Sequence, residues 1–378
     1  MKKKLLAVAV AGALAAPGLA LAQSSVTISG IFKTSLENIS IGSPSAARAV
    51  GAKNKENRLA DDSSRIIFNV VEDLGGGLAA VGQIDIRFNS ETGAGMTHSG
   101  NTHVGLRSKS MGRIIFGRQD VHYGGRESNM TDLAGSLGSD SISILSFAGG
   151  GQQSIAFASR TPNIIHYLSP NWSGFTMIAA YSMSGPSGAQ SDITSTTRAG
   201  NSLNLNPNYD AGNWQVGYSY WNSKNDTGGA TLATGDQRAS RLYGSFKIAG
   251  FKLGLAWDKS TITNTVTGVK SSDRTAWSIP VSYTAGNNQF HFHYDKARDD
   301  NATAGVQDGA KMIALSYQYT LSKRTSVGVT YAKITNDTDA TYNFFTRNTG
   351  SLGNSAAGAT PNGGEDPRLL AATIRHAF

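Results

Sequence analysis

The chain contains no cysteine, and after residue 22 it has no apolar run that approaches the length of a membrane-spanning helix. The lack of cysteine excludes disulfides and thiolate-bound metals as sources of stability. A spanning helix needs about 18 or more apolar residues in a row, so the sequence predicts no transmembrane helix. A hydrophobic content of 39% and a mean hydropathy of −0.25 describe a polar chain. Membrane strands remain compatible with that average, because only alternate side chains of such a strand face lipid.

Residues 1–22 have the order of a cleavable secretory signal. Three lysines precede an apolar stretch, and Ala20-Leu21-Ala22 forms an A-x-A cleavage site. The 44 glycines are spread along the chain with no break in composition, which favours one repetitive architecture over two domains. We therefore predict a signal over 1–22, removed on export through the secretory pathway, and one transmembrane β-barrel domain over 23–378.

The charge balance points only weakly to anionic partners. The formal net charge is +8, and it falls to +5 without the three lysines of the signal, which leaves 31 basic and 26 acidic residues. A nucleic-acid-binding domain would carry a far denser basic patch. We therefore expect no nucleic-acid partner.

Segment after segment alternates apolar and polar residues with a period of two. In 82–88, glycine, isoleucine and phenylalanine alternate with glutamine, aspartate and arginine, and 213–221, 251–258 and 276–283 follow the same pattern. This period is typical of strands with one apolar face. It does not by itself separate a soluble sandwich from a membrane barrel.

Two further features favour the membrane barrel. The apolar face is rich in aromatic residues near strand ends, namely Tyr181, Tyr209, Trp214, Trp257 and Tyr283, as expected of interfacial girdles. The connections also alternate in length. Joins after even-numbered strands have about two to four residues, whereas joins after odd-numbered strands are long and polar, an arrangement typical of an up-and-down barrel.

We predict sixteen strands, and an even number lets the last strand pair with the first. Their expected ranges are 25–38, 63–73, 78–89, 100–108, 112–119, 161–169, 173–184, 199–209, 213–223, 237–249, 251–260, 273–284, 288–298, 309–320, 325–335 and 368–378. The expected long loops are 39–62, 120–160, 185–198, 224–236, 261–272 and 336–367. A closed barrel pairs every backbone group at membrane depth. With sixteen strands the lumen is too wide for side chains alone to fill, so water or an inserted loop must occupy it.

Short motifs in the same order extend this interpretation from the first strand to the last. They are Gln23-Ser24-Ser25-Val26-Thr27, Glu72-Asp73-Leu74-Gly75-Gly76-Gly77-Leu78, His103-Val104-Gly105-Leu106-Arg107, Phe116-Gly117-Arg118-Gln119, Ser169-Pro170-Asn171-Trp172-Ser173-Gly174-Phe175, Leu321-Ser322-Lys323-Arg324-Thr325 and Arg375-His376-Ala377-Phe378. On these residues the chain resembles a Gram-negative general-diffusion porin of the β-proteobacterial branch. Each motif is weak alone, but their order and spacing are specific.

The resemblance implies a passive outer-membrane channel for ions and small hydrophilic solutes. It implies a homotrimer surrounded by outer-membrane lipids and lipopolysaccharide, with no cofactor, no bound metal and no enzymatic step. It also implies that Phe378 is an assembly signal, read by the outer-membrane insertion machinery. The alternative for Phe378 is that it simply ends the last strand.

The resemblance also assigns a constriction. In the family the loop after the fifth strand, here 120–160, folds into the lumen as the third long loop, and its acids face a wall of arginines. The expected loop acids are Asp120, Glu127, Asp132 and Asp140. The expected basic wall is Arg65, Arg107 and Arg160, with Arg87 and Arg113 as further candidates by strand period. Because guanidinium stays charged at physiological pH, such a wall favours anions mildly, although loop acids could offset it. The alternative for each arginine is a solvated wall or a rim ion pair of little functional weight.

Other sites and functions are weaker candidates. His291 and His293 lie on one face of a strand with Asp295 as the only nearby third ligand, so lumen lining is favoured over a metal site. We find none of the common catalytic motifs. A substrate-selective channel would need aromatic residues along the lumen, where mostly small polar and charged residues are expected. A barrel enzyme or an adhesin is the alternative from another class.

Overall fold

The computed structural model describes residues 24–43, 54–93, 95–122, 140–145, 155, 158–185, 193–194, 197–198, 200–225, 235–345 and 361–378. Their strands are β1 (Ser25–Gly42), β2 (Lys55–Asp61), β3 (Arg65–Gly75), β4 (Leu78–Arg87), β5 (Thr102–Ser108), β6 (Gly112–Gln119), β7 (Thr161–Leu168), β8 (Phe175–Ser182), β9 (Ile193–Thr194), β10 (Thr197–Arg198), β11 (Asn201–Asp210), β12 (Trp214–Lys224), β13 (Asp236–Ile248), β14 (Phe251–Thr263), β15 (Lys270–Ala285), β16 (Asn288–Ala297), β17 (Ala310–Thr320), β18 (Thr325–Asn336) and β19 (Asp366–Ala377). A 3-10 turn, η3 (Ser141–Ser143), lies between β6 and β7.

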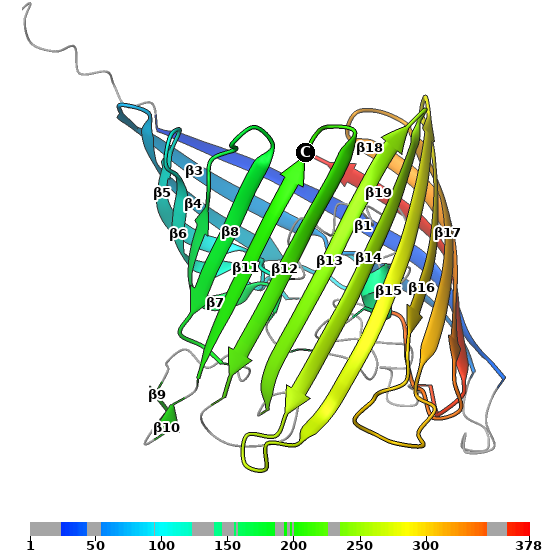
Figure 1. Ribbon diagram of the computed structural model, residues 1–378. Helices are drawn as coiled ribbons and strands as arrows, with labels where there is room; N and C mark the ends of the chain where they lie inside the picture. Colours follow the sequence, from blue (N-terminus) through cyan, green and yellow to red (C-terminus); the bar gives the residue numbers. More distant parts are fainter. Residues whose placement is uncertain are drawn as a thin grey trace, which may run out of the picture.

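The strands form one closed antiparallel barrel (Figure 1). Each barrel strand pairs with its neighbours in the chain, and β1 closes the ring by pairing with β19 from Ile31 opposite Ala377 to Gly42 opposite Asp366. The opposite edge of β1 pairs with β2 and β3, which together occupy one position in the wall. The wall therefore has sixteen positions, as the sequence predicts. β9 and β10 form a separate small hairpin between β8 and β11.

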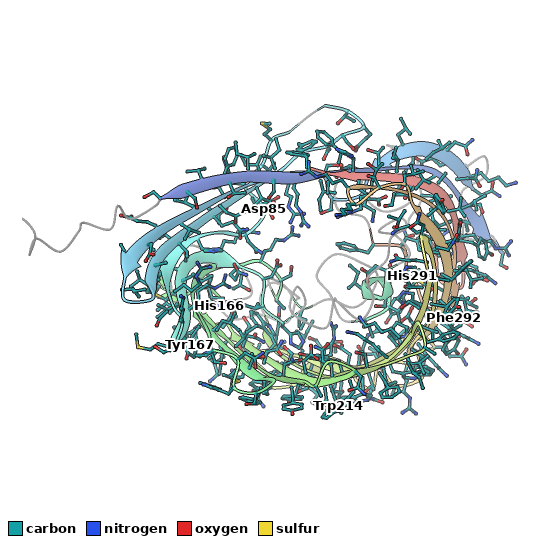
Figure 2. All side chains as sticks on the ribbon, turned by 90° about the horizontal axis from the view of Figure 1, so that it is seen from above. Asp85, His166, Tyr167, Trp214, His291 and Phe292 are labelled. Carbon is teal, nitrogen blue, oxygen red and sulfur yellow. The ribbon has the colours of Figure 1, made fainter. Side chains whose placement is uncertain are left out.

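Side chains alternate between the lumen and the outside along each strand. Figure 2 shows the inward-pointing Asp85, His166 and His291 and the outward-pointing Tyr167, Trp214 and Phe292. Outward apolar residues are exposed in the isolated chain, for example Leu36 (58%) and Leu255 (56%). The polar wall faces the lumen and the apolar wall faces outward, which is the arrangement a membrane barrel requires.

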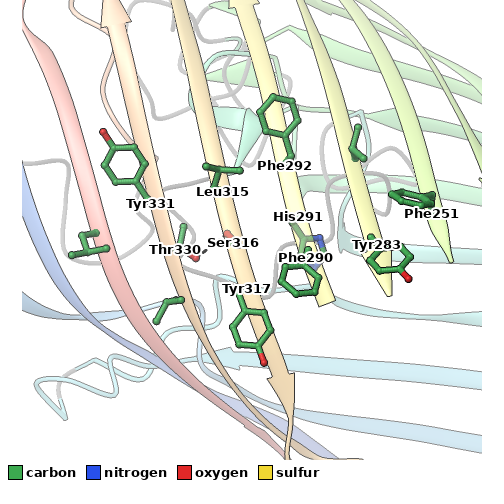
Figure 3. A pocket seen from close by; sticks show the side chains of 13 residues that line it. Phe251, Tyr283, Phe290, His291, Phe292, Leu315, Ser316, Tyr317, Thr330 and Tyr331 are labelled. Atoms are coloured by element: carbon green, nitrogen blue, oxygen red, sulfur yellow. Dashed lines mark hydrogen bonds between the residues drawn. The ribbon is translucent and has the colours of Figure 1, made fainter. Parts of the chain in front are cut away.

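Aromatic residues gather on the outside of β14–β19. Phe292, Leu315 and Tyr331 surround an apolar hollow on this outward face (Figure 3). Ring pairs bridge neighbouring strands there, with centroid separations of 4.5 Å for Phe251 and Tyr283 and 5.1 Å for Phe290 and Tyr317. The predicted girdle residues Tyr181, Tyr209, Trp214 and Trp257 are likewise exposed on the outside. These positions confirm the apolar face inferred from the period.

The structure corrects two predicted boundaries. The strand expected at 63–73 is preceded by β2 and separated from it at Asp62–Ser64, where the Asp61 carboxylate accepts hydrogen bonds from the N–H groups of Ser63 and Ser64. This local turn competes with the ladder and interrupts the strand. Much of the loop expected at 39–62 is therefore strand. The loop expected at 261–272 shrinks to 264–269, because β14 and β15 continue pairing as far as Thr263 and Lys270.

Two apolar clusters lie inside the barrel, between the wall and the long loops. One contains Ile39, Met312, Ile334 and Leu369 from the wall, and the other contains Ile164, Ile178 and Trp221. Apolar residues on a water-facing wall are unfavourable unless other apolar groups cover them. The residues that cover them come from the loops described below.

Among the described residues, no helix is long and apolar enough to cross a membrane.

Candidate functional site

Arg65 and Arg87 face each other across β3 and β4 on the lumen side of the wall. Arg87 donates from Nη2 to the Asp85 carboxylate at 2.8 Å and also contacts the Ser63 hydroxyl. Arg65 interacts electrostatically with Arg87, Asp85 and, further along the wall, Asp120. The Nε atoms of Arg65 and Arg87 have no hydrogen-bond partner among the residues the structure describes. Both Nε atoms are also buried from solvent.

Arg160 joins this group from the loop just before β7. Its backbone N–H donates to the Asp120 carboxylate at 3.3 Å, and Asp120 also accepts from Asn101 Nδ2 at 2.8 Å. Burial lowers the pKa of Arg160, the charges of Arg87 and Arg118 lower it further, and the Asp120 carboxylate opposes both. A guanidinium stays protonated under such a shift because its ordinary pKa is so high.

We define the arginine cluster as Arg65, Arg87, Arg118 and Arg160. Arg118 interacts with both Asp120 and Arg160, and sequence reasoning did not select it. The sequence feature that could have identified Arg118 was its place in the motif Phe116-Gly117-Arg118-Gln119. In the structure Gly117 has a φ of 140° at an irregularity in the strand pairing. Four guanidinium groups and two carboxylates, Asp85 and Asp120, give this part of the site a local excess of two positive charges.

Arg107 and Arg113 do not lie in the arginine cluster. They pair with each other across β5 and β6, beside the tight turn at 109–111. Arg107 also pairs with Ala79, eight residues before Arg87 on β4. At about 3.3 Å per residue, that places the two arginines roughly 26 Å apart along the strands. The expected grouping of Arg107 with Arg65 is therefore corrected: the period places both on the inner face but at different depths.

The beginning of the loop 120–160 crosses to a distant part of the wall. His122 is fully buried, and its Nδ1 lies 2.7 Å from the Ser219 hydroxyl on β12. Burial lowers the pKa of His122 well below its ordinary value of 6.5, with a further contribution from Arg241. Val121 packs in the cluster that contains Trp221. The imidazole is therefore a neutral hydrogen-bonding group that fastens the start of the loop.

The middle of the same loop contacts the other side of the lumen. Asp140 caps η3 by accepting from the Ile142 N–H at 3.1 Å, and Ile144 and Leu145 pack against Ile39 of β1. Figure 2 shows η3 inside the barrel. The inward-folded third loop is thus confirmed.

The expected loop acids have different places. Asp120 lies within the arginine cluster and not opposite it. Asp140 lies across the lumen, where it interacts with Asp295 on the inward face of β16. Glu127 and Asp132 fall outside the described residues. His293 is buried on the same inward face as Asp295, in line with its predicted orientation.

A second loop segment inside the barrel was not expected. Tyr342, Asn343, Phe344 and Phe345, which follow β18, are all nearly fully buried. The Phe345 N–H donates to the Ser143 hydroxyl at 2.9 Å, so this segment contacts the third loop directly. The aromatic run in an otherwise polar connection was the available signal, because aromatic side chains seek apolar cover.

Phe378 closes the seam of the barrel. Its backbone N–H and C=O both pair with Gly30 at 3.1 Å, and its ring lies 5.8 Å from that of Phe32. A Cβ at position 30 would lie 2.4 Å from the Phe378 ring. Gly30 therefore leaves the space that the terminal aromatic occupies.

Comparison with known proteins agrees with this architecture. A family model for Gram-negative porins matches residues 7–339. The chain belongs to the Gram-negative porin family. An outer membrane porin protein of Bordetella pertussis is 28% identical over 380 residues, covering 86% of this porin and 92% of the relative. Outer membrane porin protein 32 of Delftia acidovorans is 27% identical over 386 residues, covering 100% of both chains. The solved structure of the anion-selective porin from Comamonas acidovorans has a TM-score of 0.72 at 21% identity, covering 94% of this porin and 100% of that chain.

Family membership assigns the place and the general activity of the molecule. This porin lies in the outer membrane and forms a water-filled channel for passive diffusion of ions and small hydrophilic solutes. In outer-membrane barrels generally, the short turns face the periplasm and the longer loops lie on the extracellular side. The arginine cluster lies on the β3–β7 side of the lumen.

Proposed function

We propose that this porin is a mildly anion-selective diffusion channel whose selectivity arises from the arginine cluster. The observation that carries the proposal is the local excess of guanidinium over carboxylate: Arg65, Arg87, Arg118 and Arg160 against Asp85 and Asp120. Arg87 is neutralised by its ion pair with Asp85, whereas the other three share Asp120. Fixed charges beside a water-filled path raise the local concentration of counter-ions.

The third loop would supply the opposite side of the constriction. Its seating through His122 and Ile144 supports this role, as does the position of Asp140 across the lumen from the cluster. The separation of Asp140 from the arginines keeps the acid from neutralising them directly. The anion-selective porin of Comamonas acidovorans, with the same fold, is in keeping with this proposal. The mechanism needs no cofactor, energy source or catalytic step.

The test is the zero-current potential of the purified protein in a planar bilayer across a tenfold KCl gradient. If the channel prefers anions, the zero-current potential should have the sign set by chloride moving down its gradient. The magnitude of this potential should decrease as the salt concentration on both sides is raised. A potential of the opposite sign would contradict the assignment of the cluster as the selectivity element. A potential of zero would place the arginines on a solvated wall without influence on permeation.

We also propose a homotrimer whose contact face is the β5–β8 side of the wall. These strands have seven or eight residues, whereas the strands from β11 to β19 have ten to sixteen. A tilted strand needs about 9–11 residues to cross the hydrocarbon layer. Outward apolar residues such as Val104 and Phe116 are nevertheless exposed there. The short strands β5–β8 form an apolar wall that is better covered by neighbouring protomers than by lipid. Lipid and lipopolysaccharide would surround the side formed by the longer strands.

The mass of the detergent-solubilised protein, measured by light scattering, tests the trimer. We expect three chains per particle for the wild type and one for Val104→Glu. Leu255→Glu on the tall β14 wall serves as the matched control and should remain trimeric. A wild-type monomer would contradict the proposal.

The terminal Phe378 is proposed to serve as the signal for the insertion machinery after removal of residues 1–22. The hydrogen bonds to Gly30 also give Phe378 a structural role, so the two must be separated. Phe378→Ala should reduce insertion in cells more than refolding of the purified chain into detergent. An equal loss in both assays would favour the structural role alone.

A further inference from the structure

The segment 337–345 after β18 occupies the lumen beside the third loop. Tyr342 and Phe344 belong to the cluster that contains Ile144 and Leu145 of the third loop. The next residue, Phe345, belongs to the second cluster, with Trp221 of β12. Consecutive aromatic residues therefore contact both clusters, and the segment reaches from its own strand toward the opposite wall.

Inward apolar residues explain why this segment stays inside. Met312, Ile334 and Leu369 point into the lumen from β17, β18 and β19 and are almost completely buried. They lie in the cluster with Tyr342 and Phe344, which cover them from water. Water would reach this wall if the segment moved outward. The sequence of the wall thus requires an apolar cover at this position.

A buried arginine contacts the segment at its outer side, in addition to Asn336, whose side chain hydrogen-bonds the Tyr342 backbone. Arg274, near the outer end of β15, donates from Nη1 to the Tyr342 hydroxyl at 2.9 Å. Its Nε binds Asp300 at 3.1 Å, and its Nη2 binds Asp308 at 2.7 Å. Its Cζ also lies 5.9 Å from the centre of the Tyr342 ring. All four groups are nearly inaccessible to solvent.

The side-chain partners of Arg274 belong to loops and not to the barrel ladder. Asp300 and Asp308 lie in the connection between β16 and β17, and Tyr342 lies in the connection between β18 and β19. The two connections are joined again by the Asp339 carboxylate, which accepts from the Gln307 N–H at 2.9 Å. Arg274 therefore links one loop to the other without contributing its side chain to the strand pairing.

We propose that Arg274 is a positioning residue for permeation: it holds the segment 337–345 inward, so that this segment forms a second wall of the pore entrance beside the third loop. The inference takes the channel function as its starting point and adds a second element that sets the free cross-section. Because a planar guanidinium presents its donors in a fixed fork, lysine would reproduce the charge but not the simultaneous contacts with Asp300, Asp308 and Tyr342.

The first experiment measures the position of the segment directly. The chain has no native cysteine, so Asn343→Cys introduces a single reporter at a buried position of the segment. We expect slow labelling by a bulky maleimide in the otherwise wild-type protein. Adding Arg274→Gln should accelerate labelling by roughly 100-fold or more, because breaking one side of a buried ion pair shifts a local equilibrium by at least that factor. The matched control is Arg298→Gln, which removes the same charge from an exposed position near the start of the β16–β17 connection.

The second experiment measures permeation. Arg274→Gln should increase the single-channel conductance, whereas Arg298→Gln should leave it unchanged. In the Arg274→Gln background, Ser143→Cys with Phe345→Cys should form a disulfide that restores the wild-type conductance, and reduction should abolish the rescue. The contact of the Phe345 N–H with Ser143 Oγ at 2.9 Å makes this cross-link feasible. If Arg274→Gln does not fold, Tyr342→Phe removes only the hydroxyl acceptor and should produce a smaller increase.

Unchanged labelling and unchanged conductance in a folded Arg274→Gln barrel would overturn the proposal. A conductance increase that the cross-link does not reverse would overturn it as well, because the increase would then come from another part of the pore. The labelling rate is measured without any current, so a non-conducting wild type, which would contradict the channel itself, is distinguishable from failure of this inference.

Discussion

Neutralising Arg65 should lower anion selectivity by an amount that the geometry of the arginine cluster sets. Arg65→Gln reduces the local excess from two positive charges to one. An ion that passes about 7 Å from a guanidinium in a water-filled lumen interacts with it by about 0.6 kcal/mol. Screening at 0.1 M salt, with a Debye length of about 10 Å, reduces this to about 0.3 kcal/mol. The substitution removes about 0.3 kcal/mol of attraction for the anion and about 0.3 kcal/mol of repulsion for the cation. The anion-to-cation permeability ratio should therefore fall about threefold.

The assay is the zero-current potential across a KCl gradient, recorded for single channels at low and high salt. Arg65→Gln with Arg160→Gln should lower the ratio by roughly ninefold at 0.1 M, since the two effects multiply, and the change should nearly vanish at 1 M, where the Debye length is about 3 Å. Arg107→Gln, roughly 26 Å along the strands from Arg87, should have almost no effect. Arg324→Gln, in an exposed periplasmic turn, controls for total charge. An Arg107→Gln effect as large as that of Arg65→Gln would refute the placement of the selectivity element.

Three further predictions concern the seating of the loops and the closure of the barrel. The third loop is fastened by neutral His122, whose pKa is lowered on burial. This stabilisation is therefore complete above about pH 6.5 and is lost as the pH falls below that value. Open-channel noise should rise between pH 7.5 and 5 in the wild type and should not change with pH in His122→Gln. Trp221→Ala removes a buried side chain that packs with Val121 and Phe345, and it should weaken the packing of the third loop against the wall by about 3–5 kcal/mol. The expected result is faster proteolysis within 120–160. Unchanged proteolysis would contradict this prediction. Gly30→Val places a side chain against both the Phe378 ring and the Arg65 carbonyl oxygen and should lower the yield of heat-resistant barrel. Gly82→Val, whose Cβ would have its nearest contacts at 3.7 Å, should assemble at the wild-type yield.

The wall of the barrel could be predicted from the sequence because membrane strands repeat a local rule. The alternation of Ile84 and Ile86 with Asp85 and Arg87 needs only the period of a strand, and the parity of the loops gives the up-and-down order. The break at Asp62–Ser64 was missed because it depends on one aspartate whose carboxylate binds the backbone locally. The alternation of apolar and polar residues does not reveal where a side chain competes with strand pairing for the backbone.

The candidate site was less accessible to sequence reasoning because depth in the barrel depends on register. Arg65 and Arg107 both satisfy the period for the inner face, but the pairing of β3, β4 and β5 separates them. The burial of Tyr342 and Phe345 depends on contacts with residues about 200 positions away, such as Ser143. Neither a register nor such a long-range contact follows from spacing in a single chain.

Single-channel recording of the purified wild-type protein in a planar bilayer tests the central claim most directly, since that claim is an open passage between the arginine cluster and the inward loops. We expect discrete openings in groups of three, with a zero-current potential biased toward chloride at low salt. A bilayer that stays sealed although the inserted protein is a heat-resistant, folded barrel would contradict it.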